Sequence, residues 1–162
     1  MVEMELVGVR VELPSNTPIV LLKETQGERR LLPIFIGGPE ATAIALALDG
    51  VATPRPMTHD LLKTVLDELG VTVERVLVTD LQDGTFYAEI HMQGAGVERQ
   101  ISSRPSDAIA LAVRTGTPIF AEEDVLDEVG YTIEEEGEEE SEQVVEEFRE
   151  FIENVNPEDF AS

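Results

Sequence analysis

Two short stretches of the sequence hold residue types that can do acid–base or phosphate chemistry. One is residues 55–60, Arg-Pro-Met-Thr-His-Asp, and the other is residues 104–107, Arg-Pro-Ser-Asp. Both open with Arg-Pro, reach an aspartate by way of a hydroxyl residue, and lead into an apolar run. They are either two ordinary helix starts or two parts of one site.

Helix capping accounts for much of this similarity. Thr58 is predicted to be the N-cap of a helix over residues 60–69, because a hydroxyl oxygen can accept a hydrogen bond from the free N–H groups of a first turn. Ser103 or Ser106 is predicted to cap a second helix over residues 105–114. Proline is tolerated in a first turn, and aspartate there complements the helix dipole. Capping leaves the two arginines and the histidine unexplained.

The other interpretation is that the two stretches act together. His59 can transfer a proton near neutral pH, and Asp60 can orient it or bind a divalent cation. A guanidinium such as Arg104, beside free N–H groups at a helix start, forms an anion site that fits a phosphate. Arg55 and Asp107 complete the candidate catalytic set. The residues alone leave both interpretations open.

Carboxylates in and near these stretches could also hold a metal ion. Glu40 falls in the first turn of a helix predicted over residues 40–48. With Asp60 and Asp107 it would supply the oxygen ligands that Mg²⁺ or Mn²⁺ prefers. Each of the three also fits as an acidic residue that complements a helix dipole. The second histidine, His91, is predicted to face solvent from one side of a strand.

Apolar periodicity and turn residues predict the elements that carry these side chains. Alternating segments indicate two antiparallel meanders, and segments with helical spacing follow each of them. The extended segments are 4–13, 18–24, 29–37, 71–81, 85–93, 97–103, 118–120 and 131–133, and the helices are 40–48, 60–69, 105–114 and 122–129. The repeated pentapeptide Ala-Ile-Ala-Leu-Ala, at 43–47 and 108–112, indicates two buried helices lined with small residues.

These elements predict an α+β fold in which short helices pack on a mixed or mostly antiparallel sheet. Residues 1–133 are predicted to form one domain. Residues 134–162 are predicted to form an acidic linker and a C-terminal amphipathic helix, because a glutamate run gives way to apolar residues at helical spacing. The apolar stripe consists of Val144, Val145, Phe148, Phe151, Ile152 and Val155. It is predicted to dock on its own domain or on a neighbouring subunit.

The net charge of −23 limits the partners. Such a surface repels the phosphates of nucleic acids at long range, whereas it suits a basic protein partner. Residues 134–162, with 13 acidic residues and one arginine, carry about half of this charge. The chain has no cysteine, and no run approaches the roughly 18 apolar residues of a membrane span, so we expect a cytoplasmic protein with no membrane contact.

Three sequence blocks in succession resemble a known family. They are LPIFIGGPEATAIALALDG, PRPMTHDLLKTVLDELG and ISSRPSDAIALAVRTGTPIFAEEDVLDEVG, and they are similar to the signature blocks of the bifunctional nuclease domain family of bacterial and plant proteins. The resemblance implies an α+β fold, assembly into a homo-oligomer, and degradation of RNA and DNA without strong sequence preference. The family's polar motif positions fall here on Glu40, Arg55, Thr58, His59, Asp60, Arg104, Ser106 and Asp107.

Two functions are compatible with these observations. The first is a nonspecific nuclease assisted by Mg²⁺ or Mn²⁺, in which arginines hold the phosphate, carboxylates hold the metal, and His59 acts as general base or acid. Its cleavage is expected to be lost with a chelator and in His59→Ala. The second is a noncatalytic regulatory or assembly protein that binds a protein partner through its acidic surface.

Overall fold

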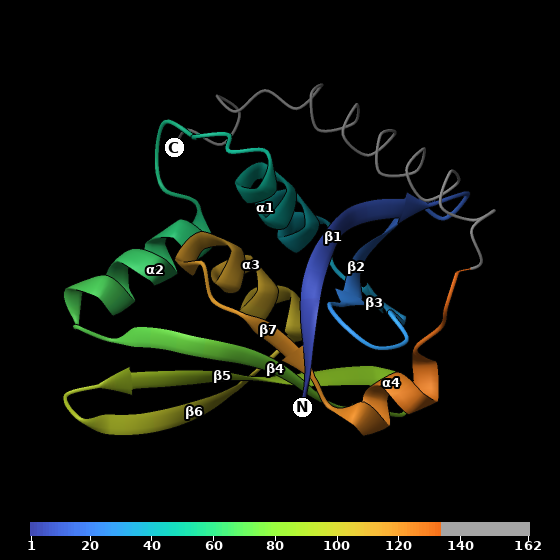
Figure 1. The fold of residues 1–162 in the computed structure, drawn as a ribbon. Helices are drawn as coiled ribbons and strands as arrows, with labels where there is room; N and C mark the ends of the chain where they lie inside the picture. Colours follow the sequence, from blue (N-terminus) through green and yellow to red (C-terminus); the bar gives the residue numbers. More distant parts are fainter. Residues whose placement is uncertain (134–162) are drawn as a thin grey trace.

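The computed structural model describes residues 1–133, which fold into a seven-stranded mixed sheet with four short helices (Figure 1). The strands are β1 (Val2–Glu12), β2 (Thr17–Glu24), β3 (Leu31–Phe35), β4 (Thr72–Gln82), β5 (Thr85–Gly94), β6 (Val97–Ser103) and β7 (Ile119–Ala121). The helices are α1 (Gly38–Leu48), α2 (Thr58–Glu68), α3 (Pro105–Thr115) and α4 (Glu123–Val129). The α+β prediction is confirmed, and the linker and helix predicted over 134–162 lie outside the described residues.

Two antiparallel meanders form the two halves of the sheet, as the turn pattern predicted. The strand order is β3-β2-β1-β7-β4-β5-β6. The short strand β7 joins the halves, because it pairs antiparallel with β1 and parallel with β4. Its residues Ile119 and Ala121 are buried at this junction. The sheet is therefore mixed, with one parallel pairing at its centre.

The helices α1, α2 and α3 pack side by side over the sheet, with α3 in the middle (Figure 1). α3 contacts β4 and β5, whereas α1 contacts β1 and β2. Small side chains allow this close approach, and Ala108, Ala110 and Ala112 are almost fully buried in the core. The two Ala-Ile-Ala-Leu-Ala segments are thus the core helices that the sequence predicted, and their packing fixes where α1 and α3 begin.

The helix starts use a different capping scheme from the predicted one. Met57, not Thr58, is the N-cap of α2, and Arg104 rather than a serine is the N-cap of α3. The Asp60 carboxylate accepts a hydrogen bond from the Met57 backbone N–H at 2.9 Å. Ser103 donates its hydroxyl proton to the Arg104 carbonyl. An aspartate three residues after the N-cap therefore satisfies the start of α2 in place of a hydroxyl.

The prediction that His91 faces solvent is wrong, because this residue is only 8% exposed. Its Nδ1 lies 3.2 Å from an Arg75 nitrogen, and its Nε2 lies 3.0 Å from a Glu89 oxygen. Arg75 stands opposite His91 in the register of β4 and β5. The alternation placed the ring on the correct polar side of the strand, but two long neighbouring side chains cover it there.

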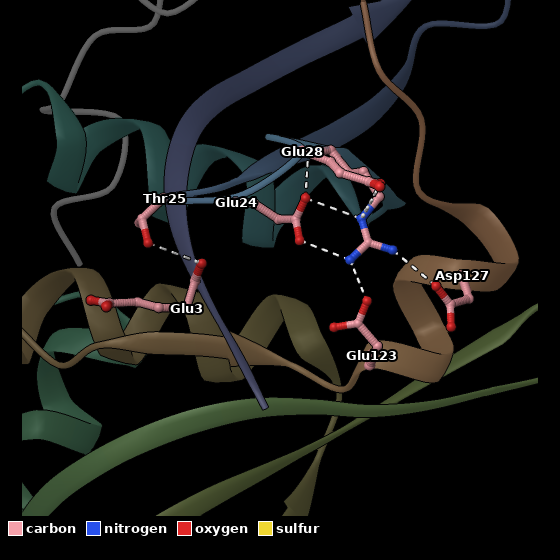
Figure 2. A network of polar contacts seen from close by, with 7 residues as sticks. Glu3, Glu24, Thr25, Glu28, Glu123 and Asp127 are labelled. Carbon is pink, nitrogen blue, oxygen red and sulfur yellow. Dashed lines mark hydrogen bonds and ion pairs between the residues drawn. The ribbon is translucent and has the colours of Figure 1, made fainter.

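The guanidinium of Arg30 links the β2–β3 connection to α4. Arg30 donates to both carboxylate oxygens of Glu24, at 3.0 Å from Nε and 2.8 Å from Nη2, and to Asp127 at 3.0 Å from Nη1. Figure 2 shows Glu24, Glu123 and Asp127 turned toward this shared centre. Hydrogen bonds from Arg30 lower the pKa of Glu24, and the bonds to Glu24 and Glu123 raise the pKa of Arg30. The cluster therefore stays charged at neutral pH.

Removal of Arg30 is expected to destabilise the domain. In Arg30→Ala, the Glu24 side chain, 4% exposed, would keep its charge without a cation. Breaking a buried ion pair from one side costs about 3–5 kcal/mol, and we expect a loss of that size in the free energy of unfolding measured with urea.

Arg29→Ala is the matched control for this prediction. Arg29 approaches Glu5 at 3.8 Å with both side chains 53% exposed, and exposed pairs of this kind contribute about 0–1 kcal/mol. Equal losses of stability in the two variants would contradict a structural role for the Arg30 cluster.

Candidate functional site

The starts of α1, α2 and α3 meet at one cavity of about 880 Å³. Glu40 comes from α1, His59 from α2, and Arg104 and Asp107 from the start of α3. The cavity continues between α2 and the strands β5 and β6, where aliphatic side chains line it. These are Leu61, Leu62, Val65, Leu66, Ile90, Met92 and Ile101. The cavity therefore has a polar end at the helix starts and an apolar end along α2.

Four side chains at the polar end form one continuous series of contacts. His59 Nε2 lies 2.9 Å from Asp107 Oδ1. Asp107 Oδ2 accepts a hydrogen bond from Arg104 Nε at 3.0 Å and forms an ion pair with Arg104 Nη2 at 2.8 Å. The same Nη2 donates to Glu40 Oε1 at 2.8 Å. The two Arg-Pro stretches thus meet in one polar cluster, which we call the His59–Asp107–Arg104–Glu40 cluster.

The contacts keep Asp107 ionised. Burial alone would raise its pKa, but hydrogen bonds from His59 and Arg104, together with the Arg104 charge, outweigh burial and lower the pKa of Asp107. Bonds to Glu40 and Asp107 raise the pKa of Arg104. An anionic carboxylate beside His59 Nε2 favours the ring form that carries a proton on Nε2.

The starts of α1 and α3 leave backbone N–H groups for a ligand. Within residues 1–133, the N-caps Gly37 and Arg104 make no side-chain capping hydrogen bond. Such N–H groups have no partner inside the helix, and they favour anions. The Arg104 side chain is 64% exposed, and its hydrogen bonds to the described residues use Nε and Nη2, not Nη1. An anion entering the cavity would meet a guanidinium edge and two helix starts.

Asp60 belongs to a different part of the structure. Its Oδ1 accepts a hydrogen bond from Arg114 Nε at 2.6 Å. Asp60 is not among the described residues that line the large cavity, but it lines a smaller one with Arg114 and Lys63. Burial would raise the pKa of Asp60, yet hydrogen bonds from Arg114 and the Met57 N–H lower it. Adjacent residues of α2 thus contact α3 near its start and near its end.

Arg114 is a positioning residue that sequence reasoning missed. Its side chain is 7% exposed. Besides Asp60, the guanidinium donates to the carbonyl of Ala43 in α1 at 2.9 Å and to that of Ala110 in α3 at 2.8 Å. One residue therefore joins all three helices. An arginine in the last turn of a helix commonly complements the dipole, so its position in the sequence gave no distinct signal.

Three other predicted positions lie at the margin of the cluster or outside it. Arg55 is exposed and is not among the described residues that line the cavity. Its carbonyl accepts a hydrogen bond from the Thr53 hydroxyl at 2.6 Å. Thr58 lines the cavity, and Ser106 is buried in the first turn of α3. The cluster therefore includes one of the two predicted arginines.

The three carboxylates predicted to hold a metal ion are each bonded to an arginine. Asp60 bonds Arg114, whereas Glu40 and Asp107 both bond Arg104. Within residues 1–133, no group of three or more His, Asp or Glu side chains could hold an ion. A divalent cation at Glu40 and Asp107 would have to displace the guanidinium between them. The Mg²⁺ or Mn²⁺ site at these carboxylates stays a prediction.

Sequence comparison places this cluster inside a known domain. The profile described as Bifunctional nuclease domain matches residues 20–134, which include all four members of the cluster. The chain belongs to the bifunctional nuclease domain family. In the described part of this family member, no helix is long and apolar enough to span a bilayer.

Relatives of this bifunctional nuclease domain protein fall into two groups. A Mycobacterium tuberculosis protein named only as uncharacterized is 46% identical over 163 residues, which cover 98% of this chain and 97% of that protein. Bifunctional nuclease 2 of Arabidopsis thaliana is 32% identical over 112 residues, 66% of this chain and 34% of its own. Bifunctional nuclease 1 of Oryza sativa subsp. indica is 29% identical over 103 residues, 62% of this chain and 31% of its own. The chain thus spans about a third of these plant nucleases.

The lowered pKa of Asp60 predicts an acid-dependent stability. The pKa of Asp60 in the folded chain lies below its unfolded value of about 3.9. Asp60 therefore binds a proton more readily in the unfolded chain, and stability is lost as pH falls through the folded pKa. We expect Asp60→Asn to lower the free energy of unfolding at pH 7 by about 1.5–3 kcal/mol. We also expect the free energy of unfolding of Asp60→Asn to fall less steeply in acid than that of the unmodified chain. Urea unfolding at several pH values measures both.

Asp67→Asn is the control for this titration. Asp67 pairs with Lys63 on the exposed side of α2, with side chains 59% and 40% exposed, so its removal should change stability little. If Asp60→Asn and the unmodified chain lost stability in acid with the same slope, the Asp60–Arg114 contact would not be the source of the pH dependence.

Proposed function

We propose that this chain is a nonspecific nuclease that hydrolyses phosphodiester bonds of RNA or DNA at the polar end of the cavity. The observation that carries the proposal is the line of contacts from His59 through Asp107 to Arg104, beside two helix starts without side-chain caps. It combines a proton acceptor, a carboxylate that orients it, and a cation that can bind phosphate. The names of the plant relatives support the same reaction class.

Each member of the cluster has a separate role in the proposed reaction. Asp107 accepts the Nε2–H of His59, which leaves the lone pair on Nδ1 to take a proton from the water that attacks phosphorus. Arg104 and the helix starts bind the phosphate oxygens and offset the charge that grows as the bond to the leaving oxygen breaks. The leaving oxygen takes its proton from solvent. Glu40 holds Arg104 in place through the bond at 2.8 Å.

The proposed contacts are made to phosphate and not to bases. Phosphate contacts carry no sequence information, so this geometry supports cleavage without strong sequence preference. The net charge of −23 opposes the approach of a polyanion, and the positive groups act only inside the cavity. Binding is therefore expected to be weak and to weaken further as salt is added.

Loss of the proton acceptor is expected to abolish most of the activity. In His59→Ala, we expect the rate of cleavage of a fluorogenic oligonucleotide to fall by about 10²–10⁴-fold, the range of general base catalysis. In Arg104→Ala, we expect a fall of about 10²–10³-fold, because a charge-stabilising donor is lost.

Two variants serve as matched controls. His91→Asn removes the other buried histidine, and Arg55→Ala removes the exposed arginine of the first Arg-Pro stretch. Both should keep the activity of the unmodified chain, once folding has been verified by circular dichroism. A cleavage rate that survives in His59→Ala would assign the activity to another site or to a contaminant.

The effect of a chelator tests the alternative with a metal ion. The sequence predicted cleavage that needs Mg²⁺ or Mn²⁺, but Arg104 bonds both carboxylates that would bind the ion. The proposal therefore expects cleavage to persist in excess EDTA after extensive dialysis. Loss of cleavage that Mg²⁺ or Mn²⁺ restores would show that an ion replaces the guanidinium between Glu40 and Asp107.

A further inference from the structure

An apolar surface on α2 and β6 has no partner among the described residues. It consists of Leu61, Leu62, Val65 and Leu69 on α2 and Val97 and Ile101 on β6, and we call it the α2–β6 surface. Leu61 is 55% exposed, Leu69 is 71% exposed and Ile101 is 50% exposed. Single exposed apolar residues are ordinary, but a contiguous group on one face marks a contact site.

The surface is continuous with the candidate site. Leu61, Leu62, Val65 and Ile101 line the same cavity as His59 and Arg104. α2 lies by the β4–β5–β6 half of the sheet (Figure 1), and side chains of α2, β5 and β6 line the cavity together. The α2–β6 surface therefore borders the cavity that holds the polar cluster.

Basic groups border the α2–β6 surface. Arg99 lies opposite Met92 in the β5–β6 register, two residues before Ile101 on β6. Every second residue of a strand faces the same side. Because Ile101 lines the cavity, Arg99 is on the cavity side of β6. Within residues 1–133, neither Arg99 nor the exposed Arg55 before α2 forms an ion pair. Arg104 offers a third exposed guanidinium at the polar end. An acidic, amphipathic partner would match both the apolar and the basic features.

The C-terminal segment of this chain has that chemistry. Its apolar residues are Val144, Val145, Phe148, Phe151, Ile152 and Val155, and acidic residues surround them in the sequence. The spacing is that of one helical face, as is the spacing of Leu61, Leu62, Val65 and Leu69 on α2. A helix over residues 144–155 would be about 18 Å long, and α2, with 11 residues, is about 17 Å long. Two stripes of equal length can pack as a helix pair.

The length of the connection bears on whether residues 144–155 can reach the α2–β6 surface of the same chain. Tyr131 bridges Leu31 at the β3 edge of the sheet, and β6 is the opposite edge. Seven strands spaced about 4.8 Å apart span about 29 Å. The ten residues from 134 to 143 can span about 33–36 Å when extended. A linker of this length can therefore cross the width of the sheet.

We propose that residues 144–155 dock on the α2–β6 surface of the same chain. The apolar stripe packs against α2, and the glutamates beside it approach Arg99 and Arg104. Docking itself does not depend on the proposed nuclease activity, and it can be tested without measuring cleavage.

Spin labels can locate the segment in the full-length chain. Because the sequence has no cysteine, a pair introduced as Thr64→Cys and Glu147→Cys would carry the only labels. Thr64 is exposed at the middle of α2. Docking places the two helix axes about 8–10 Å apart, so electron–electron double resonance should show a short, narrow distance distribution. Thr85→Cys with Glu147→Cys is the reference pair, because Thr85 follows the far end of β4, about 33 Å from the α2 end.

Charge-matched variants separate apolar docking from simple attraction. Phe148→Glu with Phe151→Glu should replace the short Thr64–Glu147 distance with a broad distribution that extends to longer distances. Gln143→Glu with Asn154→Glu adds the same charge outside the apolar stripe and should leave the short distance intact. A broad distribution in the otherwise unmodified chain would overturn the proposal. So would a short distance that disappears when labelled protein is diluted with unlabelled protein, since the surface would then be covered by another copy.

Discussion

The relative placement of α1, α2 and α3 depends on the buried guanidinium of Arg114. It binds the carbonyls of Ala43 and Ala110 and the carboxylate of Asp60, and these partners belong to the three helices. Each helix contributes a different group to the polar cluster, so none of them can form the cluster alone. Neither Arg114 nor Asp60 is among the described residues that line the large cavity. Positioning and chemistry are therefore carried by different residues on the same three helices.

The polar cluster balances its own charges. Asp107 is bonded on one side by His59 and on the other by Arg104, and Arg104 is shared with Glu40. This arrangement leaves a partly exposed guanidinium beside helix starts that are not capped by side chains. In the proposed function, this guanidinium and the backbone N–H groups bind the phosphate. The same contacts pair Glu40 and Asp107, two of the carboxylates predicted to bind a metal ion, with Arg104.

Local patterns in the sequence were sufficient for most of the fold. Alternation and turn residues identified both meanders, and the alanine-rich pentapeptides identified the core helices, because these features depend on neighbours within a few residues. Local patterns do not predict contacts between residues far apart in the sequence. Arg114 contacts Asp60 across 54 residues and Ala43 across 71 residues. Asp60 and Arg55 were assigned to the site by their motif alone, and they lie outside the cavity. His59, Arg104 and Asp107 were chosen by residue type, and only the packing of α2 on α3 shows that they touch.

The central claim is that the His59–Asp107–Arg104–Glu40 cluster binds the phosphate of a nucleic acid. The chain has two histidines, and both are buried beside a carboxylate. Nitrogen-15 spectra of histidine-labelled protein, recorded during titration with a dinucleotide, therefore contain an internal control. The account predicts that the ring resonances of His59 shift while those of His91 stay in place. A His59 ring that does not respond at saturating dinucleotide, or a response confined to His91, would contradict it.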